Sequence, residues 1–248
     1  MEEKLIDELI KKLKDKKEKY KKIFTVNKIE KSEAVKFVGL YHCLGPVNFF
    51  SEFQYGLFYK NNMVGVAAYA QPQGAMAIRG WFPNNQIKDT HEVMELQRLA
   101  MLPQINGFNA TSYLLSHSIK MIAKEGVRAI ITLADSTRHV GSIYQVTNFK
   151  YYGLTSQKSD FYVESTGKKV GHGKTKGVKG VYIPRNRKYR YAYLIDKKLL
   201  IGYPQEKPPV KNDLVLNNKK DYYIDSRLGV KQAYRYDEKH DAITKVLI

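Results

Sequence analysis

The chain has 248 residues and a formal net charge of +18, with 42 Lys and Arg against 24 Asp and Glu. Hydrophobic residues make up 43% and aromatic residues 12%, which excludes a disordered composition and suffices for one large folded domain. The single cysteine, Cys43, excludes a disulfide framework and an all-thiolate metal site. No stretch is apolar enough to span a membrane and the N-terminus has no signal-peptide pattern, so we expect a cytoplasmic protein with no membrane partner.

The N-terminal segment, which we place at residues 1–35, has the pattern of a basic amphipathic helix. Leucine and isoleucine recur at helical spacing between lysine-rich faces, at Leu5, Ile6, Leu9, Ile10 and Leu13. Such a helix docks on the body of the protein or on a partner. A helix on a membrane surface is the weaker alternative, because acidic residues interrupt the basic face.

Two strand patterns follow. Residues 53–70 form two β-rich runs around the turn signal at 60–62, which predicts a hairpin. Residues 91–101 alternate as a strand, but their apolar positions do not keep one phase. This break predicts a β-bulge near Arg98.

The next stretch predicts a helix between two strands. After Pro103 and a polar loop, Asn109 or Thr111 can cap a helix that runs to about Glu125, and Gly126 ends it. Residues 127–133 are nearly all apolar, as in a strand covered on both faces. A short helix at 141–148 and a strand or pair of strands at 150–163 complete the pattern.

The charge is concentrated in residues 166–211, which carry 13 Lys and Arg against two Asp and Glu. Glycines recur throughout the first half of this segment, and cationic residues alternate with tyrosines in the second half. Cations pair with phosphates and aromatic planes stack on unpaired bases, which predicts a nucleic-acid-binding segment. The residues predicted to make these contacts are Arg185, Arg187, Lys188, Tyr189, Arg190 and Tyr191.

The alternative for this run is a basic edge strand whose alternate tyrosines, Tyr189, Tyr191 and Tyr193, face a core. The two interpretations are compatible, because one face of a strand can pack while the other binds. Residues 212–248 show weak strand patterning at 221–226 and 231–236, and we treat them as a C-terminal extension without an assigned role.

The element order in residues 36–165 resembles that of the GNAT acyltransferase fold. The fold class implied is α/β (α+β), with a central mixed sheet flanked by helices. In that fold the loop before the long helix holds the pyrophosphate of coenzyme A through backbone N–H groups. Its Gln/Arg-x-x-Gly-x-Gly/Ala pattern is similar to Gln104–Ala110, which is one residue longer. The resemblance implies acetyl-coenzyme A as cofactor, bound by Gln104, Gly107, Asn109 and Ala110.

Several segments together resemble the Mom family of bacteriophage DNA-modification proteins over roughly residues 38–165. Residues 94–100 (MELQRLA) look like the family's Met-Glu-Leu-Asn-Arg-Met-Ala stretch. Residues 134–137 (ADST) and 141–144 (GSIY) are similar to its Ala-Asp-Ala-Thr and Gly-Thr-Ile-Tyr. Residues 109–112 and 41–43 fall where the family has Asn-Ser-Glu-Ser and His-His-Tyr.

This resemblance implies a phage enzyme, working in the bacterial cytoplasm, that alters adenine N6 in DNA with a carbamoylmethyl (acetamido) group and protects viral DNA from restriction. Family proposals include a GNAT-like site, acetyl-coenzyme A and a bound iron or other transition metal. Acetyl-coenzyme A alone does not account for a product with a methylene carbon and a terminal amide nitrogen. The site residues implied by position are His42, Arg98, Ser112, Asp135 and Tyr144.

Each implied residue also has a structural alternative. Arg98 clamps a phosphate or carbonyl, or forms a salt bridge. Asp135 orients a base, acts as a general base or ligates a metal with His42, or it caps a helix that begins at Ser136. His42 acts as a base or a metal ligand, or it is structural. Tyr144 is a general acid in the family's Tyr-x-x-x-Gly-Phe turn, or a core aromatic. Ser112 is first of all a hydrogen bonder at the helix start.

Two other functions fit the sequence. One is an ordinary GNAT N-acetyltransferase that acts on a protein or small molecule. The other is a non-catalytic nucleic-acid-binding protein that retains an acyltransferase-like fold.

Overall fold

A computed structural model describes residues 3–15, 19–45, 49–73, 75–171, 173 and 175–210, and the backbone of strands at 222–224, 233–237 and 242–246. The chain folds into two compact units. The main unit comprises residues 1–133, 141–153 and 190–208. The second unit comprises residues 134–140, 154–189 and 209–248.

A seven-stranded sheet has the order β1-β2-β3-β4-β5-β10-β6. Its first four strands pair antiparallel, whereas β4 and β5 are parallel. The sheet is therefore mixed, which confirms the predicted α/β class. Its strands are β1 (Thr25–Lys28), β2 (Phe53–Tyr59), β3 (Asn62–Ala70), β4 (Val93–Met101), β5 (Ala129–Asp135), β6 (Lys150–Leu154) and β10 (Lys188–Leu194).

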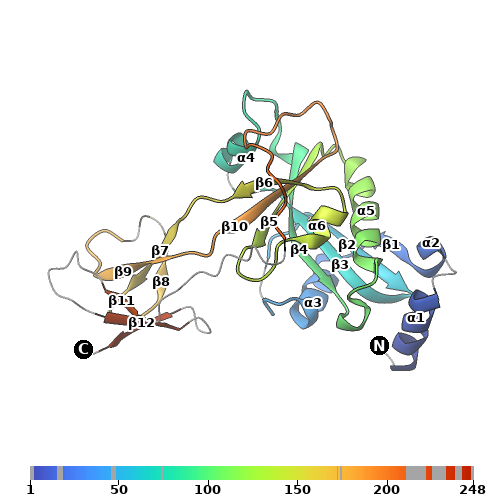
Figure 1. Ribbon diagram of the computed structural model, residues 1–248, viewed down its shortest axis with the longest axis horizontal. Helices are drawn as coiled ribbons and strands as arrows, with labels where there is room; N and C mark the ends of the chain where they lie inside the picture. The colour runs from blue at the N-terminus through green and yellow to red at the C-terminus, as the bar shows by residue number, and fades with distance from the viewer. Residues whose placement is uncertain are drawn as a thin grey trace. The chain divides into compact units, whose positions relative to one another are not determined.

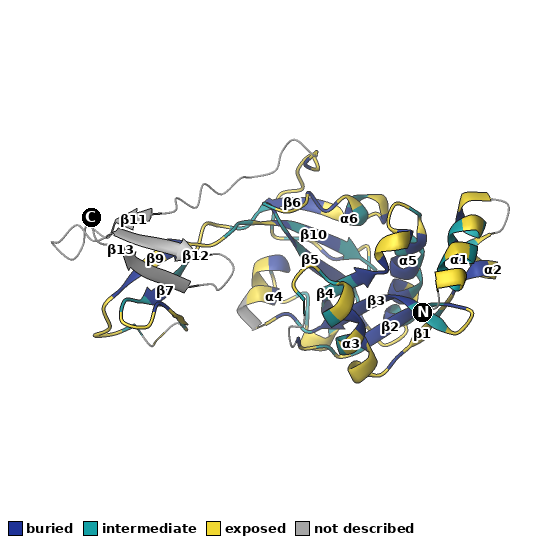
Figure 2. Ribbon diagram, turned by 90° about the horizontal axis from the view of Figure 1, so that it is seen from below, coloured by how far each residue is buried: buried dark blue, intermediate teal, exposed yellow. Residues whose placement is uncertain are grey.

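Helices cover the sheet, and α3 (Lys31–Tyr41) and α5 (Ala110–Ala123) lie on opposite faces of it (Figures 1 and 2). A hydrogen bond of 2.7 Å between the buried Tyr69 and Ser118 hydroxyls joins β3 to α5. The remaining helices are α1 (Glu3–Asp15), α2 (Tyr20–Ile23), α4 (Ala75–Trp81), α6 (Ser142–Val146) and the 3-10 turns η1 (Thr90–Glu92) and η2 (Pro103–Ile105).

The local predictions for the hairpin and the bulge are confirmed. Lys60 and Asn61 have φ angles of 46° and 65°, the left-handed turn that joins β2 to β3. The β3–β4 register shifts so that Tyr69 pairs with Leu96 but Ala68 pairs with Arg98. Gln97 is thus the extra residue of the bulge.

The predicted helix and strand after Pro103 are also present as α5 and β5. Asn109 stands at the N-cap position of α5, although its side chain makes no capping hydrogen bond. Gly126, with a φ of +86°, follows the helix as expected. The order β4, loop, α5, β5, α6, β6 agrees with the order predicted from the sequence.

The N-terminal segment is not one helix over residues 1–35. Helix α1 ends at Asp15, residues 25–28 form the edge strand β1, and a capping box at Glu30 and Glu33 starts α3. The β-branched Thr25 and Val26 favour the strand that pairs with β2. Residues 1, 2 and 16–18 of the predicted helix lie outside the described residues.

The basic segment is divided between a small sheet and the main sheet. Strand β10 is inserted between β5 and β6 of the main sheet. The second unit holds a sheet of order β8-β7-β9, with β7 (Ser159–Val163), β8 (Lys169–Val170) and β9 (Gly180–Pro184). A further sheet, β11-β12-β13, has strands Tyr222–Ile224, Ala233–Asp237 and Ala242–Val246, two of which coincide with the weak strand patterns. The rest of residues 212–248 lies outside the described residues.

Candidate active site

The two central strands of the main unit part beside the bulge. Parallel pairing of β4 with β5 runs from Val93 to Glu95, and the Thr132 hydroxyl then donates to the Leu96 carbonyl at 3.2 Å. Beyond this point β4 continues to Met101, and no further β4–β5 pair occurs among the described residues. The bulge and the strand separation therefore occur at the same place, Gln97 and Arg98.

Arg98 is a half-buried cation that is incompletely paired. Its Nη1 donates to the Gln97 carbonyl at 2.7 Å, and its guanidinium lies 5.5 Å from the centroid of the Phe49 ring. Its Nε is buried and, in the part of the chain that the structure describes, has no hydrogen-bond partner. Burial lowers the pKa of Arg98, although Glu95 and Cys43 oppose that shift. An unpaired buried donor is costly, so this atom is suited to a ligand oxygen.

Tyr144 lies in the same part of the main unit. The residue is 8% exposed, and its ring contacts Phe149 and Tyr191 at centroid distances of 5.7 and 5.4 Å. Burial raises the pKa of the Tyr144 phenol, which is also a hydrogen-bond partner of Thr132 and is influenced by Cys43 and Glu95. The phenol is therefore neutral at physiological pH and can donate a proton. Asn148, which replaces the glycine of the GNAT turn, adopts the left-handed φ of 66°.

The end of α3 brings His42 and Cys43 toward this site. The His42 Nδ1 atom accepts the Leu44 N–H at 3.2 Å and lies 3.9 Å from the Cys43 sulfur. His42 thus serves the turn that ends α3. Cys43 is exposed, and the pKa values of both Arg98 and Tyr144 respond to the charges of Cys43 and Glu95.

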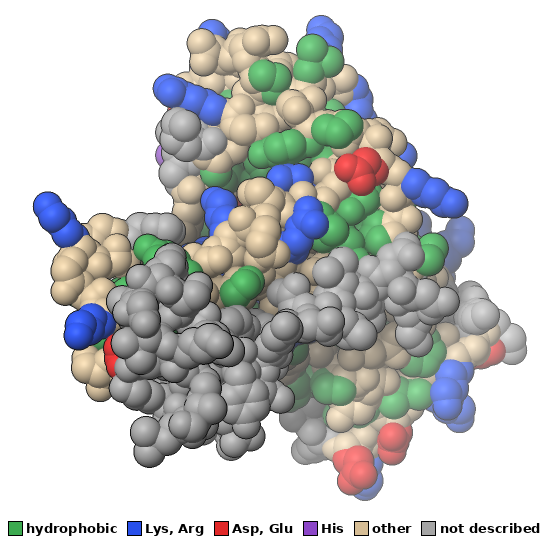
Figure 3. Space-filling model, turned by 60° about the vertical axis from the view of Figure 1, so that its left-hand side comes forward, with side chains coloured by type: hydrophobic (Ala, Val, Ile, Leu, Met, Phe, Trp, Pro, Cys, Tyr) green, Lys and Arg blue, Asp and Glu red, His purple; other side chains and the backbone are tan. Residues whose placement is uncertain are grey.

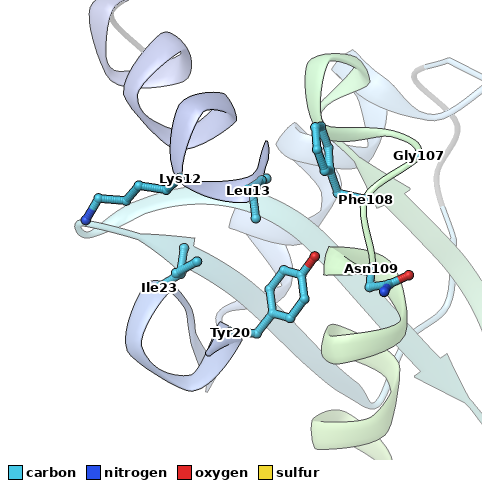
Figure 4. A pocket seen from close by; sticks show the side chains of 7 residues that line it. All are labelled: Lys12, Leu13, Tyr20, Ile23, Gly107, Phe108 and Asn109. Atoms are coloured by element: carbon cyan, nitrogen blue, oxygen red, sulfur yellow. The ribbon is translucent and has the colours of Figure 1, made fainter. Parts of the chain in front are cut away.

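A cavity of about 370 Å³ lies at the start of α5 (Figure 4). Gly107, Phe108 and Asn109 line one side, and residues of α1 and α2 line the other. The Tyr20 hydroxyl points toward the Phe108–Asn109 turn, whereas the Lys12 side chain points away from it (Figure 4). Since no side chain caps α5, its first-turn N–H groups are available to an anion, which fits the phosphates of a coenzyme A ester.

The predicted cofactor and helix-start residues differ in their placement. Gly107 and Asn109 line the cavity, and Gly107 has the positive φ of +93° that favours glycine. Gln104 is exposed in η2, and Ala110 is fully buried. The Ser112 hydroxyl donates to the Asn109 carbonyl at 2.8 Å, as expected of a helix-start hydrogen bonder.

Asp135 belongs to the second unit and stabilises a turn there. Its Oδ1 accepts the Thr137 N–H at 3.0 Å and the Thr137 hydroxyl at 2.8 Å. Its Oδ2 lies 3.5 Å from the Asn186 amide and 3.9 Å from the Arg138 guanidinium. Residues 136–138 form a turn rather than the expected helix, and Asp135 caps this turn.

The residues around His42 and Asp135 do not fit a metal centre. His42 Nδ1 is already an acceptor in its turn, and both Asp135 oxygens lie close to local donors. Among the described residues, no three His, Cys, Asp or Glu side chains gather closely enough to hold a metal ion. We therefore derive no step through iron.

The predicted nucleic-acid residues require a correction. Tyr189 and Tyr191 are 2% and 0% exposed, so their rings are core residues of β10 and cannot stack on a base. Arg185 forms an ion pair with Asp160, and Arg187 Nε donates to the Thr155 carbonyl at 2.7 Å.

Within the main unit, the Arg190 guanidinium lies 4.1 Å from the centroid of the Tyr203 ring. Lys188, the sixth of the predicted residues, is exposed and remains suited to a phosphate. Lys and Arg side chains appear at many separate points of the surface in Figure 3, in accord with the high net charge.

Sequence reasoning did not select Phe49, Glu95 or Gln97. Glu95 and Gln97 lie inside the quoted 94–100 motif, so the predicted bulge could have indicated them. Phe49 lies 49 positions before Arg98, and no local pattern connects the two.

The described elements form a mixed α/β sheet in the order predicted from the resemblance to the GNAT fold, and β4 and β5 part beside the half-buried Arg98. The chain belongs to the Mom protein family, whose model matches residues 23–209. This match includes much of the basic segment, beyond the 38–165 region of resemblance. No curated protein matches the chain in sequence. No helix in the described ranges is long and apolar enough to cross a membrane.

Several solved acetyltransferases are similar in chain path. An IAA acetyltransferase from Bacillus cereus is 14% identical in sequence and has a TM-score of 0.43. The alignment covers 69% of this chain and 99% of the acetyltransferase chain. A Bacillus subtilis acetyltransferase in complex with CoA is 13% identical over 69% of this chain and 97% of its own, with a TM-score of 0.41. A GNAT family acetyltransferase from Elizabethkingia anophelis, with acetyl-CoA bound, is 11% identical over 69% and 97%, with a TM-score of 0.43.

Proposed function

We propose that this protein modifies the exocyclic N6 amine of adenine in DNA and uses a coenzyme A ester as a cofactor. Membership of the Mom family supports the substrate, and the Arg98 site supports a catalytic role. The observation that carries the proposal is the buried, unpaired Nε of Arg98 where β4 leaves β5. A costly buried donor at this position is typical of a site that binds a ligand or substrate oxygen.

The residues of this site have separable tasks. The planar guanidinium of Arg98, which stacks over the Phe49 ring, binds an oxygen that carries negative charge. The Tyr144 phenol, which burial keeps protonated, supplies a proton to a departing group. When bound at Gly107–Asn109, the coenzyme A ester would supply an activated acyl carbon.

Adenine N6 is a weak nucleophile because its lone pair is delocalised into the ring. The modification forms one bond from N6 to carbon and breaks the bond from that carbon to the leaving group, which takes up the proton of Tyr144 while N6 loses one proton. Because the nucleophile is weak, the base has to be held in a fixed position next to that carbon. A base inside a duplex is out of reach, and the substrate adenine is therefore flipped out or single-stranded. The modified base then protects DNA from nucleases that read adenine.

Restriction of plasmid DNA tests this function. DNA from cells that express the protein should resist nucleases whose sites contain adenine and stay sensitive to nucleases whose sites contain only G and C. The Arg98→Met variant should give fully sensitive DNA, and Arg79→Met, an exposed arginine on α4, should behave as wild type. Equal cutting of all DNAs by the adenine-reading nucleases, with soluble protein present, contradicts the proposal.

A further inference from the structure

A second cavity of about 320 Å³ lies in the main unit beside the bulge. Phe50, Glu52, Gln71 and Gln97 contribute to its lining. Its volume is at the lower end of the range of about 300 to 1,000 Å³ for small-ligand pockets. Gln97 also supplies the carbonyl that accepts a hydrogen bond from Arg98, and Phe50 is the chain neighbour of Phe49, so this cavity adjoins the Arg98 site.

Phe50 is an aromatic residue left in solvent at this cavity. It is 75% exposed, whereas the adjacent Phe49 is 6% exposed and packs against Arg98. The Lys31 ammonium lies 5.9 Å from the centroid of the Phe50 ring. An exposed flat ring beside a cation is suited to a nucleotide, because the ring stacks on the base and the cation attracts its phosphate.

Polar groups on the cavity wall are complementary to a base edge. The side-chain amide of Gln97 makes no hydrogen bond within the described part of the chain, so its donor and acceptor are both available. A glutamine amide can form two hydrogen bonds with adenine, one to the N6 amine and one to a ring nitrogen.

A hydrogen-bond network fixes the positions of Gln71 and Glu52, two other residues that line the cavity. The Thr90 hydroxyl donates to Gln71 Oε1 at 2.9 Å, and Gln71 Nε2 lies 2.9 Å from His91 Nε2. His91 Nδ1 in turn lies 2.8 Å from Glu52 Oε1. Gln71 Nε2 also donates to Glu52 Oε2 at 3.4 Å, so these contacts orient both Gln71 and Glu52. Each carboxylate oxygen has two lone pairs, which leaves Glu52 able to accept from an amine as well.

We propose that this cavity receives the unpaired adenine base, with Phe50 stacked on the ring, Gln97 bonded to its edge and Glu52 accepting from the N6 amine. The choice of adenine rests on the proposed function, whereas the fit to a flat base with an exocyclic amine rests on the cavity. The cavity places the base next to Arg98 along β4. Phe50, Gln97 and Glu52 are thus binding residues for the substrate.

Photo-cross-linking tests the location without requiring activity. The probe is a single-stranded oligodeoxynucleotide in which one adenine is replaced by 8-azidoadenine. After irradiation with the full chain, tryptic peptides 37–60, 61–79 and 89–98, which hold the cavity residues, should carry the label. Phe50→Ala should lower this labelling at least about fivefold, because one base–aromatic stack is removed.

Two variants control for folding. Phe50→Trp should keep the labelling, and Leu200→Ala, which removes another exposed apolar side chain, should leave it unchanged. Label confined to other peptides, or Phe50→Ala labelling equal to wild type, overturns the location. Mass spectrometry of the nucleosides in DNA from expressing cells distinguishes the failure of this proposal from the failure of the proposed function. Modified adenine without cavity labelling contradicts only the cavity, and cavity labelling with unmodified adenine contradicts only the proposed function.

Discussion

The Arg98 guanidinium lies 5.5 Å from the centroid of the Phe49 ring, and no hydrogen-bond acceptor reaches its buried Nε among the described residues. An aromatic face can hold a cation without neutralising it. The arrangement therefore leaves a strong, directed donor at the point where β4 and β5 part. Such a donor costs stability in the absence of a ligand, which is the usual signature of a functional position.

The first prediction concerns activity and stability at this position. Arg98→Met should lower the modification rate by at least about 100-fold, because a preorganised donor to a charged oxygen is removed. The free energy of unfolding should stay within about 1 kcal/mol of wild type or rise, since the buried unpaired Nε is no longer present. Chemical denaturation and initial rates measure the two quantities.

A matched arginine provides the control. Arg128 donates to Glu92 at 2.6 Å and to Asp196 at 2.8 Å, so its charge is fully paired. Arg128→Met should lower the free energy of unfolding by leaving two carboxylates without their partner. A loss of stability in Arg98→Met as large as that in Arg128→Met would contradict a functional role for the unpaired donor.

The second prediction concerns the pH dependence of the Tyr144 phenol. Burial raises its pKa above the usual 10.0, so the protonated form persists as the pH rises through 10. Any Tyr144-dependent decrease of the wild-type rate should therefore have its midpoint above pH 10. Tyr144→Phe should lower the rate by about 10²- to 10⁴-fold over this range. A decrease with a midpoint below 10 that is absent from Tyr144→Phe would refute the assignment of this phenol as the acid.

The third prediction separates cofactor binding from helix stability at the two ends of α5. Gly107 and Gly126 have φ angles of +93° and +86°, and an added Cβ at either would meet nothing within 4 Å. Alanine at either position should therefore cost a similar backbone strain, about 1 kcal/mol. Only Gly107→Ala should weaken coenzyme A binding, by several-fold in titration calorimetry. Equal affinities for the two variants would argue against a phosphate site at this turn.

The fourth prediction concerns DNA binding by the second unit. Its arginines 185 and 187 already have protein partners, so we expect exposed lysines to bind phosphates. Replacement of Lys168, Lys176, Lys179 and Lys188 by Gln should reduce the salt dependence of binding. On duplex DNA, the slope of log K against log salt should fall by about 0.9 for each phosphate that the variant no longer neutralises.

The control for this variant changes the same charge elsewhere. Lys11, Lys14, Lys21 and Lys22 are exposed on α1 and α2, and their replacement by Gln should leave the slope nearly unchanged. Equal slopes for the two quadruple variants would show that the second unit does not bind the DNA phosphates.

Local sequence patterns were sufficient to predict many of the helices, strands and turns of the fold. The Lys60–Asn61 turn, the bulge at Gln97 and the glycine after α5 each depend on a few neighbouring residues. Hydrophobic periodicity and turn chemistry act over the same short range, so these elements could be predicted.

Features that depend on distant pairing could not be predicted. Strand β10 lies between β5 and β6, although the charge of residues 166–211 suggested an appended segment. The alternation that places tyrosines in the core also places cations between them, so the stacking role predicted for Tyr189 and Tyr191 was wrong, whereas phosphate binding by the exposed Lys188 stays a prediction. Likewise, Phe49 and Arg98 lie 49 positions apart in the sequence and meet only in the folded chain.

Mass spectrometry of nucleosides from the DNA of expressing cells tests the central claim most directly. With wild-type protein we expect a deoxyadenosine derivative of higher mass, and with Arg98→Met at equal soluble levels we expect only unmodified deoxyadenosine. An unmodified deoxyadenosine profile with abundant, soluble wild-type protein would contradict the account.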